Sequence, residues 1–178
     1  MSYGFGSLSN SSHRVQRPIA LPEPVFSDKL SKAAVRILTA RQAIPDCTIL
    51  IRPKSITELH NSVNSPFNVL HRTVKCGSPT KASSFRFQCT PFVSVPEAPG
   101  FEFISSIWED KKPLHPQPAV ALRQNRMSTA SAARHLHSFH VVAPVIGLVW
   151  AHSKVRAHVD WCTRGDVPVS FSLMHSRT

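Results

Sequence analysis

The stretch VIGLVWAHSKVRAHVDW, residues 145–161, carries the clearest structural signal in the chain. Residues 145–150 are almost continuously apolar, and a tight turn is expected near His152 and Ser153. Beyond the turn, apolar residues at 155, 157, 159 and 161 alternate with Arg156, His158 and Asp160. Such alternation is typical of a strand whose successive side chains point to opposite faces. The stretch therefore predicts a β-hairpin with one buried apolar face and one polar face.

Helices and strands are also expected upstream of this hairpin. Pro116 and Pro118 suit the first turn of a helix over about residues 119–139, a segment rich in Ala, Arg and Gln. Apolar segments predict strands over residues 101–108 and 47–51. Two helix starts are indicated by capping residues: Ser27 before a helix over 28–43, and the capping-box spacing of residues 55–58. This order predicts an α/β or α+β fold around a mixed sheet.

The remaining segments have weaker patterns. Residues 1–26 show no helical or strand period and are predicted to be a flexible leader, and residues 163–178 a tail. Residues 61–99 are predicted to be mainly loop, with short strand candidates over 85–89 and 92–95. One domain over residues 27–162 follows from these boundaries.

The charge of the chain favours a polyanionic partner. Its 178 residues include 21 Lys and Arg against 10 Asp and Glu, which gives a net charge of +11. An excess of this size favours nucleic acid as a partner but does not bear on the fold. Apolar residues make up 42% of the chain, so a buried core is expected and wholesale disorder is not.

Neither a membrane span nor a secretory signal is expected. A spanning helix needs about 20 apolar residues, and no stretch of the chain approaches that length. Residues 1–13 lack the basic start and apolar run of a secretory signal. The four Cys residues form no C-x-x-C pair, which argues against a zinc ribbon or a disulfide scaffold. We therefore expect an intracellular protein, nuclear or cytoplasmic, without a membrane partner.

Charged residues follow directly on the predicted strand 101–108. In the run Glu109-Asp110-Lys111-Lys112, alternation puts Glu109 and Lys111 on one face of the extended chain. A carboxylate can bind Mg²⁺, which polarises a phosphate, while an ammonium stabilises the developing negative charge. Asp46 is a candidate second carboxylate, because it precedes the other predicted buried strand.

These residues resemble a known motif. Pro45-Asp46 before an apolar strand, and Glu109-x-Lys111 at the end of another, are similar to the two halves of the PD-(D/E)XK nuclease motif. The order of elements over about residues 27–162 resembles the fungal PD-(D/E)XK nuclease-like proteins. The resemblance implies a restriction-endonuclease-like fold, a mixed sheet flanked by helices with a C-terminal β-hairpin, and Mg²⁺-dependent cleavage of DNA.

The resemblance also implies a role for each matching residue. Asp46 and Glu109 would ligate Mg²⁺, Lys111 would assist the attacking water, and Gln124 would position the site from the following helix. The sequence departs from the family in the long interval between Asp46 and Glu109 and in having Ser128 four residues after Gln124. A member without catalytic activity is therefore an alternative. A shift of one residue would instead pair Asp110 with Lys112.

Basic residues on the helix after the motif are candidate DNA contacts. Arg123 and Arg126 are three residues apart and could grip one phosphate track beside Lys111 and Lys112, or could form an ordinary solvated helix face. Two further metal hypotheses are weaker, since neither matches a known ligand spacing: they involve His135, His137 and His140, and Cys47, Cys76 and Cys89 with His71. Asp160 is expected to form a surface pair with Arg156.

Two other interpretations remain open at this stage. The first is a basic nucleic-acid-binding or interaction module that keeps the fold without the chemistry. The second is a truncated or drifted reading frame, for which poor packing of residues 61–99 is expected.

Overall fold

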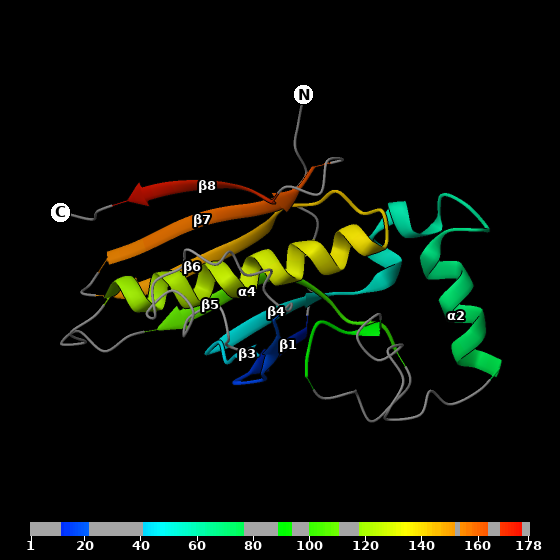
Figure 1. The fold of residues 1–178 in the computed structure, drawn as a ribbon, viewed down its shortest axis with the longest axis horizontal. Coiled ribbons are helices and arrows are strands. Elements are labelled where there is room, and N and C mark those ends of the chain that lie inside the picture. Colours follow the sequence, from blue (N-terminus) through cyan, green and yellow to red (C-terminus); the bar gives the residue numbers. More distant parts are fainter. Residues whose placement is uncertain are drawn as a thin grey trace, which may run out of the picture.

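Six strands form one mixed sheet, and a long helix, α4 (Pro118–Ser138), lies across one of its faces (Figure 1). The computed structural model describes residues 12–21, 41–76, 89–93, 100–110, 118–151, 154–163 and 168–175. In spatial order, the strands are β1 (Ser12–Val15), β4 (Cys47–Ile51), β5 (Phe103–Asp110), β6 (Val145–Ala151), β7 (Lys154–Cys162) and β8 (Pro168–His175). The predicted α/β class with a mixed sheet is confirmed.

The sheet is mixed because α4 connects two parallel strands at its centre. Strand β5 pairs in parallel with β6, and α4 is the crossover between them, as parallel neighbours require. Every other neighbouring pair in the sheet is antiparallel. The hairpin predicted over residues 145–161 is confirmed as β6 and β7, with Ile146 paired to Val159. The helix predicted over residues 119–139 is confirmed as α4.

An aromatic cluster forms the core at the C-terminal end of α4. The rings of Phe103 and Phe139 meet edge to face with centroids 5.2 Å apart, and those of Phe67 and Phe101 are 4.8 Å apart. Such geometries add to the stabilisation from burial alone, by about 0.5–1.5 kcal/mol for each pair. The His135 ring is buried and packs against the Phe103 ring with their centroids 5.5 Å apart, so His135 is part of the core.

The N-terminal residues are joined to this core by a small second sheet and an ion pair. Strand β2 (Ile19–Ala20) pairs with β3 (Gln42–Ala43), and Ile19 is completely buried. Arg17 Nη1 donates to both carboxylate oxygens of Glu102, at 2.7 and 2.9 Å. Its guanidinium also lies 4.2 Å from the centre of the Phe92 ring. Residues 12–21 are thus held by backbone pairing, charge and aromatic contact.

Several predicted elements differ from the structure near the N-terminus. Most of the helix predicted over 28–43 lies outside the described residues, but its last two residues, Gln42–Ala43, form strand β3. The capping box over 55–58 is replaced by two short 3-10 helices, η2 (Pro53–Ser55) and η3 (Thr57–His60), whose N-caps make no side-chain bond. Strands β1 and β2 lie within residues 1–26, which were predicted to be a flexible leader.

The predicted loop over 61–99 contains helix α2 (Pro66–Cys76). Ser65 marks its start, since its Oγ accepts a hydrogen bond from the Asn68 amide at 3.2 Å. Phe67 in α2, like Phe92 farther on, is buried in the core. Of the short strands predicted here, the first falls almost wholly outside the described residues, and Phe92 makes only an isolated bridge to Ile19.

Strand β8 lies within residues 163–178, which were predicted to be a tail. It pairs with β7 along its whole length, from Pro168 opposite Cys162 to His175 opposite Val155. The added strand covers the backbone edge that β7 would otherwise expose. The sheet therefore extends into the predicted tail.

The two faces of the sheet have the reverse of the predicted polarity around β7. His158 and Asp160 are 1% and 3% exposed beneath α4, whereas Val155 and Trp161, on the other face, are only half-buried. The outer face also exposes Trp108 and Trp150 to 44% and 56%. The prediction of a buried apolar face is therefore wrong for β7, although Val145 and Val149 of β6 are buried. The reason is that α4 supplies polar partners to the polar face.

Candidate functional site

Asp46 and Glu109 come from the ends of neighbouring strands. Cys47 pairs with Trp108 in the antiparallel register of β4 and β5, so the register continued by one residue sets Asp46 opposite Glu109. The Asp46 Oδ2 atom accepts a hydrogen bond of 2.7 Å from the backbone N–H of Asp110. The Asp46 carboxylate therefore reaches the last residues of β5, immediately beside Glu109.

The side chains at the end of β5 alternate between the two faces, as predicted. Glu109 is 1% exposed, while Trp108 is 44% exposed and Asp110 is also exposed. The buried side of β5 is the side that α4 covers, so Glu109 lies beneath the helix. Asp110, the acid of the alternative one-residue shift, lies on the outer face with Trp108.

The remaining predicted site residues are divided between α4 and residues outside the described ranges. Lys111 and Lys112 lie outside them. Gln124 Nε2 donates to the carbonyl of Ile44 at 3.1 Å, which joins α4 to the segment that leads into Asp46. Arg123 and Arg126 are both exposed on α4.

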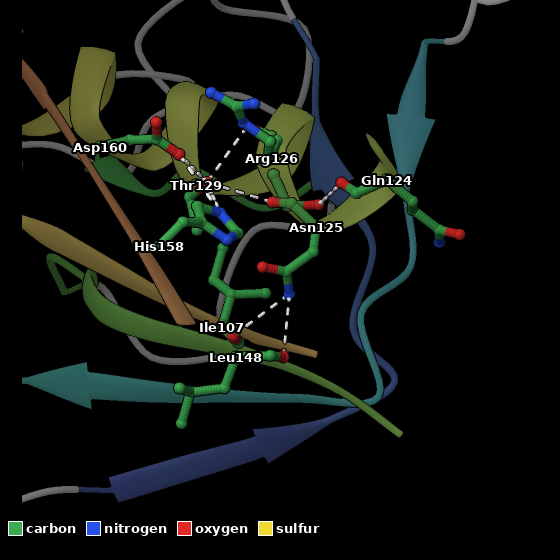
Figure 2. A network of polar contacts seen from close by, with 9 residues as sticks. Ile107, Gln124, Asn125, Arg126, Thr129, Leu148, His158 and Asp160 are labelled. Atoms are coloured by element: carbon green, nitrogen blue, oxygen red, sulfur yellow. Dashed lines mark hydrogen bonds and ion pairs between the residues drawn. The ribbon is translucent and has the colours of Figure 1, made fainter. Parts of the chain in front are cut away.

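A polar group buried between α4 and the sheet was not predicted (Figure 2). The Asn125 side chain donates through Nδ2 to two carbonyls of adjacent strands, Ile107 at 3.2 Å on β5 and Leu148 at 3.5 Å on β6. Asn125 is completely buried. It therefore fixes the position of α4 above the parallel strand pair through backbone atoms.

Thr129, His158 and Asp160 form the second half of this group. The Thr129 hydroxyl donates to Asp160 Oδ2 in a short hydrogen bond, and His158 Nε2 lies 3.1 Å from the same hydroxyl oxygen. Because the hydroxyl has one hydrogen and gives it to the carboxylate, the His158 ring donates to Thr129 through Nε2–H. Figure 2 shows the three side chains converging between the helix and β7.

The arrangement is not that of a nucleophilic triad. In such a triad the hydroxyl and the carboxylate bind opposite nitrogens of the imidazole. Here Thr129 and Asp160 both lie at Nε2, with Asp160 Oδ2 at 3.4 Å from it. Asp160 is thus a buried partner of His158 and Thr129, and the predicted surface pair with Arg156 is wrong.

Burial keeps His158 neutral. Desolvation lowers the pKa of His158 from its ordinary value of 6.5, the Asp160 carboxylate raises it, and the Arg126 guanidinium lowers it. Desolvation dominates because the ring is 1% exposed. Among the residues that the structure describes, His158 Nδ1 and Asn125 Oδ1 are buried without a hydrogen-bond partner.

Gly147 allows the helix to approach the sheet this closely. It lies on β6, between Ile107 on β5 and His158 on β7. A Cβ atom at Gly147 would overlap both the His158 ring and Asn125 Oδ1. The spacing of Asn125 and Thr129, four residues apart in an Ala-rich helix, places them on one face of the helix but does not show whether that face points inward.

The weaker metal hypotheses find no support in the described ranges. There, no group of three or more His, Cys, Asp or Glu residues is arranged to hold a metal ion. His135 packs among phenylalanine rings, and Cys89 is buried, which raises the pKa of its thiol to about 11. A buried neutral thiol is a poor metal ligand because the thiolate is the binding form.

Comparison of the chain with family models, curated proteins and solved structures gave no match. Within the described parts of the chain, none of the helices has the length and apolar character that crossing a bilayer requires.

Proposed function

We propose that this chain is an endonuclease-like protein that acts on DNA with Mg²⁺. The observation that supports the proposal is the hydrogen bond from the Asp110 amide to Asp46 Oδ2. It brings a carboxylate from one strand to the end of the next, beside Glu109. The net charge of +11 suits a DNA partner.

The donor set suits this ion, because Mg²⁺ is commonly held by one or two carboxylates together with water and substrate phosphate. Asp46 and Glu109 would hold it, and when bound it would polarise the phosphate and acidify a water molecule. Lys111 would stabilise the negative charge that develops on the phosphate. Gln124 acts as a positioning residue, since its bond to Ile44 holds the chain two residues before Asp46.

A second candidate is a basic module that binds nucleic acid without cleaving it. Glu109 is 1% exposed, and the Asp46 carboxylate already accepts a backbone hydrogen bond. A hydrated ion and a phosphate need an open path to their ligands, and burial of Glu109 counts against such access. The exposed guanidinium groups of Arg123 and Arg126 would still bind phosphates in this protein.

A plasmid nicking assay separates the two candidates. The intact protein is incubated with supercoiled plasmid and Mg²⁺, beside the variants Asp46→Asn, Glu109→Gln and Lys111→Ala. Glu58→Gln is the matched control, because Glu58 is an exposed acid on η3, which follows the end of β4 opposite to Asp46. We expect nicking by the unmutated protein and the control, and its loss in the three site variants.

DNA binding is measured in parallel by a salt titration. Phosphate contacts weaken steeply as salt rises, so the affinity must fall with salt if either candidate is correct. Equal binding without nicking in all five proteins supports the non-catalytic module and contradicts the nuclease. Absence of binding at low salt contradicts both.

A further inference from the structure

A pocket of about 390 Å³ lies between α4 and the segment around β3. On the helix it is lined by Val120, Arg123, Gln124 and Met127, whose spacing puts them on one helical face. On the other side it is lined by Leu21, Gln42, Ala43 and Ile44. In Figure 2 the Gln124 side chain points away from the Thr129, His158 and Asp160 group, so the pocket is separate from that buried group.

The pocket combines apolar walls with one cation. Two of the apolar lining residues, Ile44 and Val120, are 45% and 42% exposed. Arg123 is exposed in the same wall. Pockets of this size and mixed lining are typical of small-ligand sites. The chemistry favours a ligand with an apolar part and an anionic group.

The pocket is also next to the proposed DNA site. Ile44 forms part of its wall and is two residues before Asp46. Two residues of extended chain span at most about 7 Å. The hydrogen bond from Gln124 Nε2 to the Ile44 carbonyl joins two residues that line the pocket and holds the chain that leads to Asp46. A ligand in the pocket would therefore lie close to the carboxylates that the proposed function uses.

From these observations we propose that the pocket binds one unstacked nucleotide of a single-stranded or frayed DNA end. The base lies against Ile44, Val120 and Met127, and Arg123 binds the phosphate. A duplex is too wide for a cavity of about 390 Å³, so only a nucleotide outside the base stack can enter. The inference rests on the proposed function for the identity of its ligand, and it specifies the substrate as DNA with an unpaired nucleotide.

Fluorescence anisotropy tests the proposal without any cleavage. A labelled ten-residue oligothymidine and a labelled ten-base-pair duplex with G·C pairs at both ends, which limit fraying, are titrated with the intact protein in EDTA. The variants are Arg123→Ala, which removes the cation, and Val120→Trp, which fills the pocket. Arg134→Ala is the matched control, because Arg134 is exposed on the same helix and is not a lining residue.

We expect the single strand to bind more tightly than the duplex, and Arg123→Ala to weaken single-strand binding about tenfold, as for loss of a charge-assisted hydrogen bond. Val120→Trp should weaken it similarly. Arg134→Ala should weaken it less than about twofold, because Arg134 does not line the pocket and its longer-range attraction to the strand is screened by salt. Circular dichroism confirms that each variant is folded. Free thymidine monophosphate is added as a competitor: displacement shows that a free nucleotide suffices, and its failure shows that the nucleotide is recognised within a strand.

Equal affinity for strand and duplex, or equal effects of Arg123→Ala and Arg134→Ala, would overturn the inference. Absence of single-strand binding would do so as well. Because EDTA removes Mg²⁺, a protein that fails the nicking assay can still pass this one. A protein that nicks plasmid while its pocket variants bind normally refutes the pocket alone.

Discussion

Replacing Gly147 with Ala tests whether the close approach of α4 to the sheet stabilises the fold. The added methyl group would overlap the His158 ring and Asn125 Oδ1, both held between rigid elements. Overpacking of this kind costs about 1–3 kcal/mol. Displacing Asn125 also weakens its bonds to the Ile107 and Leu148 carbonyls, which costs less than about 1 kcal/mol for each bond. We expect Gly147→Ala to lower the free energy of unfolding by about 3 kcal/mol.

Urea denaturation followed by far-ultraviolet circular dichroism measures this change. With a slope of about 2 kcal/mol/M, the midpoint should fall by about 1.5 M. Gly100→Ala is the matched control, since Gly100 is exposed and no described glycine has a positive φ angle. Both substitutions restrict the unfolded chain equally, so their difference isolates the overlap. Equal midpoints for the two variants would refute the role assigned to Gly147.

Two further predictions concern ionisable side chains that the fold buries wholly or in part. Because the pKa of His158 is lowered in the folded protein, the unfolded chain binds more protons below pH 6.5, and stability should decline as pH falls from 7.5 to 5.5. This decline should be about 1 kcal/mol smaller in His158→Gln, as measured by urea midpoints at the two pH values, and equal declines would contradict it. Glu102→Gln removes the carboxylate charge that binds the Arg17 guanidinium, whose side chain is 16% exposed. This substitution should lower the free energy of unfolding by about 3 kcal/mol, as measured by thermal melting. The control Lys54→Ala, at an exposed residue, should lower it by less than about 0.5 kcal/mol. Equal melting temperatures for the two variants would show that the ion pair does not stabilise the fold.

Local periodicity was sufficient to predict the central part of the fold. The hairpin, α4 and strand β4 all follow from patterns within single segments, and the predicted bounds of α4 differ by one residue at each end. The prediction that side chains around Glu109 alternate between the two faces of β5 is also confirmed, because successive residues of a strand point to opposite faces.

Which face of a strand is buried could not be predicted from the same pattern. On β7 the apolar residues alternate with His158 and Asp160, and hydrophobicity alone favours burying the apolar ones. The outcome depends on Thr129, which comes from a distant helix and bonds both polar side chains. Contacts of this kind are long-range and leave no local period.

Two missed elements did have local signals. Helix α2 begins with Ser65-Pro66, a capping residue followed by the residue preferred at the first helical position. Strand β8 contains the alternating sequence Val-Ser-Phe-Ser-Leu over residues 169–173. The Asp46 bond to the Asp110 amide, by contrast, needed the register of β4 against β5, which no single segment specifies.

The outward position of Trp108 and Trp150 determines what optical measurements of this protein report. Two of its three indoles are about half exposed to water, on the side of the sheet away from α4. Their emission should be red-shifted in the native protein and readily quenched by acrylamide. Loss of packing beneath α4 would then change the emission little, while the helical ellipticity would fall.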